Sequence, residues 1–343
     1  MILDQAPVLV FRHLNALTDG RGLFEHAAGG TTPHVADGYS LDDNARGLVV
    51  VCREPRPAPN VAGLSRRYLD FVLSAVQPDG RCHNRMSDEG LWTDAADVGD
   101  GWGRAVWALA VAATSAENSA LQGRALTGFR VAAKQRSPHL HAMAFAGLGA
   151  AEILRRFPDD AVAADLLGDS VDRIWWDEAE DVGNWHWPEP RLRYANAALA
   201  ETMLLGGDLL AQDPVYSRGL EMLQFLLDVE IRDGHLSVTP AGGRGPGEVE
   251  PAGLQRPAEV AALADACVSA FRITREQRWL DGIELSWRWF LGQNDASVSM
   301  FDQATGAGYD GLDAAGRDEN QGAQSTLAML STAQHARRLL IRA

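Results

Sequence analysis

Apolar residues recur along this chain with the spacing of an α-helix, and this repetition limits the fold more than any other feature. It predicts helices at 4–18, 42–54, 62–76, 102–116, 120–134, 138–156, 161–176, 194–211, 214–230, 256–274, 276–292 and 321–341. Strict alternation of apolar and polar residues, the pattern of a half-buried strand, is almost absent. The sequence therefore predicts an all-α protein.

The predicted helices are of two kinds that alternate along the chain. One kind carries charged residues on one face, as expected of helices on a surface. The other kind is rich in Ala and Gly, which allow close approach of helices, and each member follows a polar, aromatic-rich segment. These segments begin the stretches GYSLDDNARGL, GDGWGRAVWAL, SPHLHAMAFAGL, RYANAALAETML, QRPAEVAALADAC and NQGAQSTLAML.

Six hairpins of one outer and one inner helix account for the alternation. The inner helices follow one another at irregular intervals of about 40 to 65 residues, so a short solenoid repeat does not fit. We expect the hairpins to close into an (α/α)6 toroid that forms one domain, 1–343. All inner helices would begin at one rim, where the polar segments converge. The Gly-rich stretch 239–253 is expected to form a long loop over that rim.

The charge and the cysteine content limit the partners and the cellular location that we expect for the protein. The formal net charge of −15 repels nucleic acid and anionic membrane surfaces, so neither is expected as a partner. No apolar run approaches the roughly 20 residues of a spanning helix, and the N-terminal segment lacks the features of a signal peptide. Cys52, Cys82 and Cys267 are widely spaced, as expected of free thiols. We therefore expect a cytoplasmic protein.

Carboxylates gather in the segments that lead into the inner helices. They are Asp42, Asp43, Asp94, Asp97, Asp100, Glu189, Glu250, Glu259, Asp318 and Glu319. Helix N-terminal capping explains about half of them, and Ser40 with Asp43 resembles a capping box. A glycosidase also needs two carboxyl groups facing a sugar, one protonated and one ionised. Crowding and burial raise the pKa of one acid and so supply the protonated group.

The densest polar group is Asp42, Asp43, Asn44 and Arg46, at the start of the first predicted inner helix. One acid in a first helical turn is favoured by the helix dipole. Capping does not explain the second acid, the amide, or the guanidinium one turn after Asp42. This group is therefore a candidate part of a site.

Aromatic residues are interleaved with the acids. Those at the predicted rim are Tyr39, Trp92, Trp102, Trp185, Trp187, Tyr194 and Tyr309. Aromatic faces stack on pyranose rings while neighbouring polar groups bind hydroxyls, so the set favours a carbohydrate site. The competing interpretation is that these side chains close the end of the ring by packing.

Other chemistries lack their sequence signatures. No HExxH pattern is present, and the isolated pair His139 and His141 is a weak metal signal. Dinucleotide-binding and P-loop glycine motifs are absent, as is the GxSxG motif of serine hydrolases. We therefore expect no metal and no cofactor.

Six motifs of the chain resemble those of a bacterial family of α/α-toroid domains. They are GYSLDDNARGL, DGWGRAVWAL, RYANAALAETML and DENQGAQSTLAML, with FRHLNALTDGRGLFEHA and DGLDAAGRDENQGA. Its members occur alone or joined C-terminally to retaining-type glycosyltransferases, and the family resembles the six-hairpin glycosidase superfamily. The likeness runs over residues 11–335. It implies an (α/α)6 toroid, carbohydrate chemistry and a glycosyltransferase partner.

The resemblance assigns roles to the positions that match its motifs. These are Gly38, Tyr39, Asp42, Asp43, Asn44, Arg46, Asp100, Gly103, Arg104, Asn196, Asn320, Gln321 and Gly322. Two sites depart from the family pattern. Gly101 and Trp102 stand where a small polar residue and a His are usual. Ala195 and Ala198 replace an Asp and an Arg on either side of Asn196.

We expect a glycoside hydrolase that acts on an oligosaccharide or glycan by inversion. The expected catalytic pair is Asp42 or Asp43 with Asp100 or Glu189, because inversion needs carboxyl groups about 6.5–9.5 Å apart with a water between them. The residues expected to bind the substrate are Tyr39, Asn44, Arg46, Trp102, Arg104, Trp185, Trp187, Asn196, Glu319, Asn320 and Gln321.

Two alternatives stay open. A sugar epimerase or polysaccharide lyase on the same scaffold would use a His or Tyr base beside Arg, and His34, His83 and Arg46 are candidates. A carbohydrate-binding module that serves a glycosyltransferase without catalysis would show saturable binding and no turnover.

Overall fold

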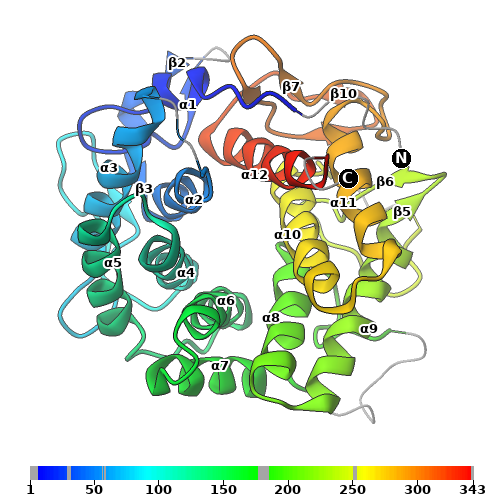
Figure 1. Cartoon of the computed structure of the whole chain (residues 1–343). Coiled ribbons are helices and arrows are strands. Elements are labelled where there is room, and N and C mark those ends of the chain that lie inside the picture. Colours follow the sequence, from blue (N-terminus) through cyan, green and yellow to red (C-terminus); the bar gives the residue numbers. More distant parts are fainter. Residues whose placement is uncertain are drawn as a thin grey trace.

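The computed structural model shows two concentric rings of helices in the described part of the chain, residues 7–28, 32–55, 57, 59–176, 185–249 and 253–340 (Figure 1). The inner ring consists of α2 (Leu41–Cys52), α4 (Asp100–Ser115), α6 (Leu140–Arg156), α8 (Asn196–Leu209), α10 (Pro257–Thr274) and α12 (Ala323–Leu340). Each inner helix packs against the next, and α12 packs against α2, which closes the ring.

The outer ring consists of α1 (Arg12–Ala16), α3 (Pro59–Ala75), α5 (Ser119–Ala132), α7 (Ala161–Ile174), α9 (Asp213–Glu230) and α11 (Gln277–Phe290). Each outer helix from α3 to α11 follows an inner helix and packs against it, while α1 packs against α12. The predicted (α/α)6 toroid is thereby confirmed.

The helix predicted at 4–18 is much shorter than expected. Its residues 4–6 lie outside the described residues, and 7–11 are not helical. The cause is a tertiary contact, because the backbone N–H of His13 donates to the carbonyl oxygen of Thr305 at 2.9 Å. A methyl group on Gly306 would clash with the carbonyl of Val10, so the two segments lie against each other and only α1 becomes helical.

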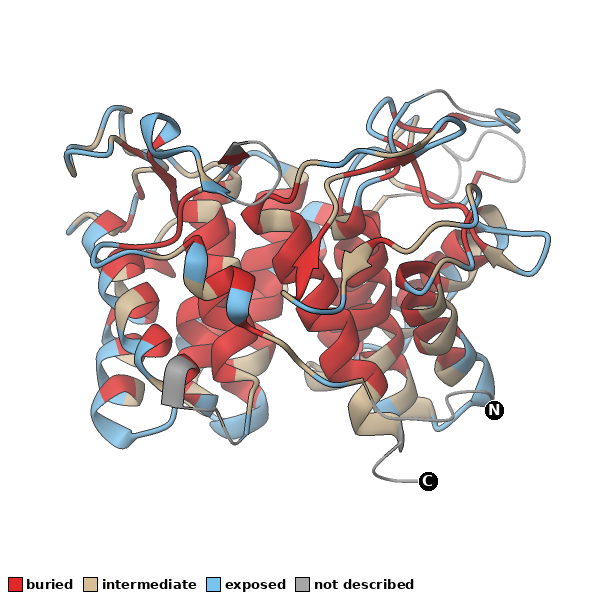
Figure 2. Cartoon of the chain, turned by 90° about the horizontal axis from the view of Figure 1, so that it is seen from above, coloured by how far each residue is buried: buried red, intermediate tan, exposed pale blue. Residues whose placement is uncertain are grey.

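The two ends of the ring differ in their connections. Behind each inner helix the chain turns within a few residues, as at 210–212 and 275–276. In front of the inner helices long connections occur, as at 17–40, 76–99 and 291–322, and they gather on one face (Figure 2). We call this face, where the inner helices begin, the upper mouth, and the opposite face the lower mouth. The stretch predicted as a loop at 239–253 belongs to the upper mouth in its described part.

Pairs of two-residue antiparallel strands brace the upper mouth. They are β1 (Ala27–Ala28) with β2 (Thr32–Pro33), β3 (Tyr39–Ser40) with β4 (Arg85–Met86), β5 (Ile231–Arg232) with β6 (His235–Leu236), β7 (Phe301–Asp302) with β8 (Ala307–Gly308), and β9 (Leu312–Asp313) with β10 (Gly316–Arg317). A 3-10 helix, Val35–Asp37, precedes β3. Strands this short leave no alternating sequence pattern, which is why the sequence predicted none.

The start of α2 is held by a capping arrangement. The Ser40 hydroxyl accepts a hydrogen bond from the Asp43 N–H at 3.1 Å and donates to the Asp43 carboxyl group at 2.8 Å. The predicted capping box is therefore present in altered form, because the acid binds the Ser40 hydroxyl instead of its backbone N–H. Asn118 and Asp160 cap α5 and α7 through their side chains in the ordinary way.

Small residues let the inner helices touch. A methyl group on Gly103 would clash with the carbonyl of Ala142, and one on Gly149 would lie 2.9 Å from the Cα of Trp107, so α4 and α6 are in backbone contact. The inner helices are buried on nearly all sides (Figure 2). Among the described helices none is both long and apolar enough to cross a membrane.

Candidate active site at the upper mouth

A cavity of about 450 Å³ opens at the upper mouth, and we call it the upper cavity. Its polar lining comes from segments that are far apart in the sequence. It includes Glu25, Asp42, Asp43, Arg46, Asn84, Asp100, Arg104, Tyr194, Arg256, Asp310 and Ser325. Three of the four predicted catalytic acids and both predicted arginines therefore share one cavity.

Asp42 is held between two arginines. The Nε of Arg46, one turn later, donates to Asp42 Oδ2 at 2.9 Å, and Arg104 forms an ion pair with Asp42 Oδ1. Burial acts to raise the pKa of Asp42, but Arg104 and Arg46 outweigh it and keep the pKa below its ordinary value. Burial and the charge of Arg46 lower the pKa of Arg104 to about 10, so Arg104 stays charged at neutral pH. Asp42 is therefore ionised and compensated.

Asp43 has the opposite protonation. Its residue is 4% exposed, and burial, followed by the charge of Asp42, raises its pKa to about 7. The two adjacent carboxyl groups therefore differ in protonation. Asp42 is an anion, and Asp43 is an acid that still carries its proton near neutral pH. This is the property a general acid needs.

Asp100 begins α4 and has a different partner. The hydroxyl of Tyr194, from the segment before α8, donates to Asp100 Oδ2 at 2.5 Å. The Tyr194 ring stacks on His141 with 4.4 Å between ring centroids. Burial lowers the pKa of His141 to about 4, so His141 is neutral at physiological pH.

Glu189, the fourth predicted catalytic acid, lies behind His141. Its Oε2 is 3.9 Å from His141 Nε2, and its Oε1 is 3.5 Å from Arg193 Nε. Burial raises the pKa of Glu189. Glu189 does not line the upper cavity, so the structure separates it from the other three predicted catalytic acids and places it beside His141.

Asn44 and Tyr39 support the wall of the cavity instead of facing it. Asn44 Oδ1 accepts from the N–H of Leu23 at 2.9 Å, and its Nδ2 donates back to the Leu23 carbonyl at 3.1 Å. Tyr39 is 1% exposed, stacks on Phe24 and donates its hydroxyl to Asp19 at 2.7 Å. Other protein groups bind the polar atoms of these two predicted substrate-binding residues, and neither residue lines the upper cavity.

The predicted tryptophans are packing residues. Trp102 is fully buried and its Nε1 donates to the carbonyl of Ala132 in α5 at 3.1 Å. Trp185 and Trp187 are buried against Phe225, with ring centroids 5.2 and 6.2 Å away. None of the three lines the upper cavity, which favours the competing interpretation that they close the ring end by packing.

Four more predicted binding residues organise the segments around the cavity without lining it. Asn196 Oδ1 accepts from the N–H of Arg193 at 2.9 Å and shapes the turn before α8. The backbone oxygen of Gln321 accepts from the ring of His13 at 2.8 Å.

Glu319 is exposed and pairs with Arg317 at 2.9 Å. Asn320 donates to Asp310, which does line the cavity. Of these four predicted binding residues outside the cavity, Asn320 is the one whose side chain bonds a residue that lines it.

Asp310 is the main cavity residue that the sequence did not indicate. Its carboxylate accepts hydrogen bonds from the Asn320 side chain, the Gly322 N–H and the Ser325 hydroxyl, and so fixes the start of α12. The sequence prediction covers acids that directly precede a predicted helix, whereas Asp310 follows β8 and lies 13 residues before α12 begins at Ala323. Glu250, also predicted at this rim, lies outside the described residues.

The histidines proposed for an epimerase or lyase do not line the upper cavity. His34 is half exposed and pairs with Asp37 at 2.8 Å. His83 stacks on Trp92, and its Nδ1 lies 2.9 Å from the carbonyl oxygen of Asp94. In the part of the chain that the structure describes, no group of three or more side chains suited to a metal ion is found.

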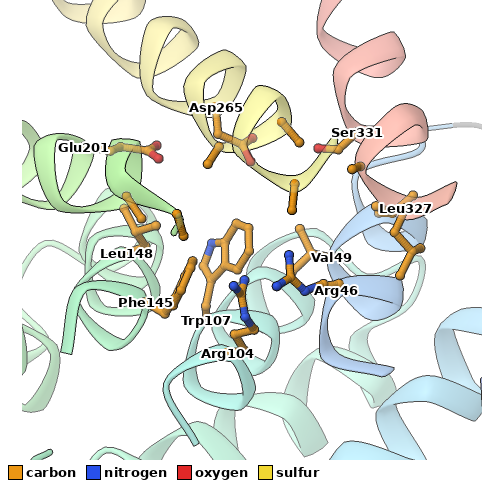
Figure 3. Close-up of a pocket in the computed structure, with 17 residues that line it drawn as sticks. Arg46, Val49, Arg104, Trp107, Phe145, Leu148, Glu201, Asp265, Leu327 and Ser331 are labelled. Atoms are coloured by element: carbon orange, nitrogen blue, oxygen red, sulfur yellow. The ribbon is translucent and has the colours of Figure 1, made fainter. Parts of the chain in front are cut away.

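Beneath the upper cavity lies a small central cavity of about 50 Å³ (Figure 3). Arg46 and Arg104 border both cavities, and the indole of Trp107 lies in the middle of the central one. Ala195 and Ala198, which replace the Asp and Arg implied by the resemblance, line this space. Their short side chains keep it open and apolar.

Comparison with known proteins bears on the fold. No family model and no curated protein sequence matches the chain. A sugar epimerase from a ruminal bacterium is similar in structure, with a TM-score of 0.71, 12% identity and coverage of 96% of both chains. The cellobiose 2-epimerase of Spirochaeta thermophila has a TM-score of 0.67 and 14% identity, covering 97% of this chain and 94% of that one.

A hydrolase shares the architecture as well. The GH76 α-mannanase of Bacteroides thetaiotaomicron has a TM-score of 0.62 and 10% identity, covering 89% of this chain and 88% of that one. At these identities the likeness establishes the (α/α)6 toroid.

Proposed function

We propose that this protein is a carbohydrate-active enzyme of the six-hairpin fold and that it is a glycoside hydrolase. The observation that supports this most strongly is the unequal protonation of acids in one cavity. Asp43 has a pKa raised to about 7, whereas neighbouring Asp42 is held ionised by arginines. A protonated acid beside ionised carboxylates is what glycosidic cleavage needs.

In the proposed reaction Asp43 is the general acid and Asp100 is the general base. Asp43 gives its proton to the glycosidic oxygen as the bond between that oxygen and the anomeric carbon breaks. Asp100 takes a proton from a water molecule, whose oxygen then bonds to the anomeric carbon. The Tyr194 hydroxyl, 2.5 Å from Asp100, orients this carboxylate. The attack of water from the opposite side inverts the anomeric centre.

The arginines of the cavity have a positioning role in this proposal. Arg46 and Arg104 compensate the charge of Asp42, which would otherwise repel the other carboxylates of the cavity. Their remaining N–H groups border the upper and central cavities and are suited to sugar hydroxyls.

An epimerase is the second candidate. It is favoured by the two epimerase structures, which this chain covers almost completely, and by the neutral His141, which does not line the upper cavity itself but stacks on the cavity residue Tyr194. A neutral imidazole can take a proton from a carbon next to a carbonyl group, and epimerisation then requires that a proton donor on the opposite face return a proton to that carbon. The product would have the same mass as the substrate.

The motif resemblance supports one further part of the proposal, a glycosyltransferase as partner. In this arrangement the toroid would act on a glycan that the transferase extends. Co-purification of a glycosyltransferase with this chain from its native host is the expected outcome. Recovery of the chain without a transferase under mild extraction speaks against the partnership.

One experiment separates the candidates. The protein is incubated with a panel of oligosaccharides, once in water enriched in oxygen-18 and once in deuterium oxide, and the products are analysed by mass spectrometry. Hydrolysis places oxygen-18 at a new reducing end, whereas epimerisation places deuterium on carbon.

Variants test the residue assignment in the same assay. Asp43→Asn and Asp100→Asn should each abolish cleavage, while Asp70→Asn, in an exposed ion pair on α3, should not. Cleavage by both site variants at the parent rate would refute the assignment of Asp43 and Asp100 as the catalytic acids. Saturable binding of a glycan, with neither oxygen-18 nor deuterium incorporated into it, would favour a binding module.

A further inference from the structure

A second polar cavity, of about 410 Å³, opens at the lower mouth, and we call it the lower cavity. Most of its charged lining comes from the ends of inner helices, the opposite ends from those at the upper cavity, and Glu201 and Asp265 come from within α8 and α10. Four guanidinium groups line it: Arg53, Arg155, Arg272 and Arg338. Such a concentration of positive charge is unexpected in a chain with a net charge of −15.

Two of the four guanidinium groups have carboxylate partners. Arg53 Nη1 lies 2.6 Å from Asp265 Oδ1, and Arg155 Nη1 lies 3.7 Å from Glu152 Oε1. His335 Nε2 is also 2.6 Å from Asp265, so that carboxylate is shared.

The other two lack such compensation. Among the described residues no carboxylate lies within ion-pair distance of Arg272 or Arg338. Arg338 instead donates to the backbone carbonyl of Arg53, which brings the two guanidinium-bearing residues together.

The arginines repel one another. Burial, and then Arg53 and Arg272, lower the pKa of Arg338 to about 10. Burial raises the pKa of Glu201, another cavity residue, to about 7, so that this acid opposes the positive charge only in part at neutral pH. The cavity therefore holds positive charge that a bound anion would relieve.

We propose that the lower cavity is a binding site for a small phosphorylated molecule, with Arg272 and Arg338 contacting the phosphate. The planar fork of a guanidinium group matches the oxygens of phosphate. Two uncompensated arginines balance the charge of about −1.5 to −2 that a phosphate monoester carries at pH 7, whereas a monocarboxylate would balance one. Small-molecule sites measure roughly 300–1,000 Å³, so the cavity admits a molecule of hexose phosphate size.

This site is separate from the proposed reaction site. Asp265 and Glu201 border both the lower and the central cavity, whereas Arg46 and Arg104 border the central and the upper one. The apolar central cavity therefore lies between the two polar ones. The proposal does not depend on which reaction occurs at the upper mouth.

The test measures binding of three probes to the full chain by calorimetry at physiological ionic strength: inorganic phosphate, glucose 6-phosphate and acetate. We expect both phosphates to bind and acetate to bind far more weakly. Tighter binding of glucose 6-phosphate than of phosphate would identify a sugar phosphate as the better ligand class. Equal binding of acetate and phosphate, or no binding of either phosphate at millimolar concentration, would overturn the proposal.

Two variants and two controls locate the site. Arg272→Gln and Arg338→Gln should each weaken phosphate binding by about tenfold or more, because each removes a charge-assisted hydrogen bond. Arg256→Gln alters the upper cavity, and Arg66→Gln alters an exposed pair on α3; both should bind phosphate like the parent. If Arg256→Gln weakens phosphate binding while Arg272→Gln and Arg338→Gln bind phosphate normally, the anion binds at the upper mouth and the assignment is refuted. Circular dichroism checks that each variant is folded.

Discussion

The two mouths of the ring contain the same kind of acid pair. At the upper mouth Asp42 is ionised between cationic side chains, while burial raises the pKa of adjacent Asp43 to about 7. At the lower mouth Asp265 is ionised by its partners, while burial and Asp265 raise the pKa of Glu201 to about 7. At both ends of the ring, one acid of the pair is therefore an anion and the other has a raised pKa.

The surroundings of the two pairs differ. The upper pair lies near another carboxylate, Asp100, with its Tyr194 partner. The lower pair lies near additional positive charge, Arg272 and Arg338. The first setting suits proton transfer to and from a neutral sugar, and the second suits an anion. The comparison teaches that the acid pair alone does not define a function, because its neighbours decide what the mouth can bind.

The largest expected effect is on catalysis at the upper mouth. Asp43→Asn should lower kcat by about 10²–10⁴-fold, because it removes the general acid. The matched control is Glu230→Gln, which alters a buried acid that bonds Thr239 and lines neither mouth. A similar loss of activity in both variants would mean that burial, and not position, explains the effect. The values of kcat are measured by steady-state kinetics on the substrate that the isotope assay identifies.

The next effect is on stability at the lower mouth. Asp265→Ala leaves Arg53 and His335 without their buried partner, so the free energy of unfolding should fall by about 3–5 kcal/mol. Asp70→Ala, which removes an exposed partner of Arg124, should cost about 1 kcal/mol or less. Denaturant unfolding monitored by circular dichroism compares them. Equal losses would show that the ion pairs of Asp265 stabilise the fold no more than a surface pair does.

A third effect is the pH dependence of the upper mouth. Activity should fall about tenfold per pH unit above pH 7, as Asp43 loses its proton. The folded protein also holds this proton where the unfolded chain does not, between about pH 4 and 7, so rising pH lowers the free energy of unfolding in that range. Asp43→Asn should reduce this decline and be more stable than the parent at pH 8. If the free energy of unfolding of the variant depends on pH in the same way as that of the parent, the raised pKa of Asp43 is contradicted.

The smallest effect compares the hydroxyl groups that bind an acid at each mouth. Ser269 donates to Glu201 at 2.6 Å, and both residues are buried. Ser269→Ala should cost about 1–3 kcal/mol, because a buried oxygen loses its donor. Tyr194→Phe should cost under about 1 kcal/mol, because water can replace the hydroxyl at half-buried Asp100. Thermal unfolding of the two variants gives the comparison, and a reversed order would contradict it.

The sequence predicted the upper mouth better than the lower for a physical reason. Asp43, Asp100 and Arg104 lie at the first turns of inner helices, where the ring topology brings helix starts together. Arg53 follows the last turn of α2 and Asp265 lies in the middle of α10, and nothing in the sequence indicated that the two side chains meet across the ring.

The aromatic residues could not be assigned from the sequence because helix rotation was unknown. Trp102 is in the first turn of α4, as expected, but its indole points to Ala132 of the outer helix and not to the cavity. The helix bounds agree closely with prediction from α2 onward, because the periodic apolar pattern fixes them. The short helix α1 differs, because a contact with the distant residue Thr305 determines its start.

The most direct test of the central claim is a titration of Asp43 itself. The protein is labelled with carbon-13 at aspartate carboxyl groups, and its NMR spectrum is recorded from pH 4 to pH 9, with Asp43→Asn used to assign the signal. We expect the signal lost in the variant to titrate with a midpoint near 7. If that signal instead titrates near 4, like an exposed aspartate, the upper mouth holds no acid that is protonated at neutral pH, and the account fails.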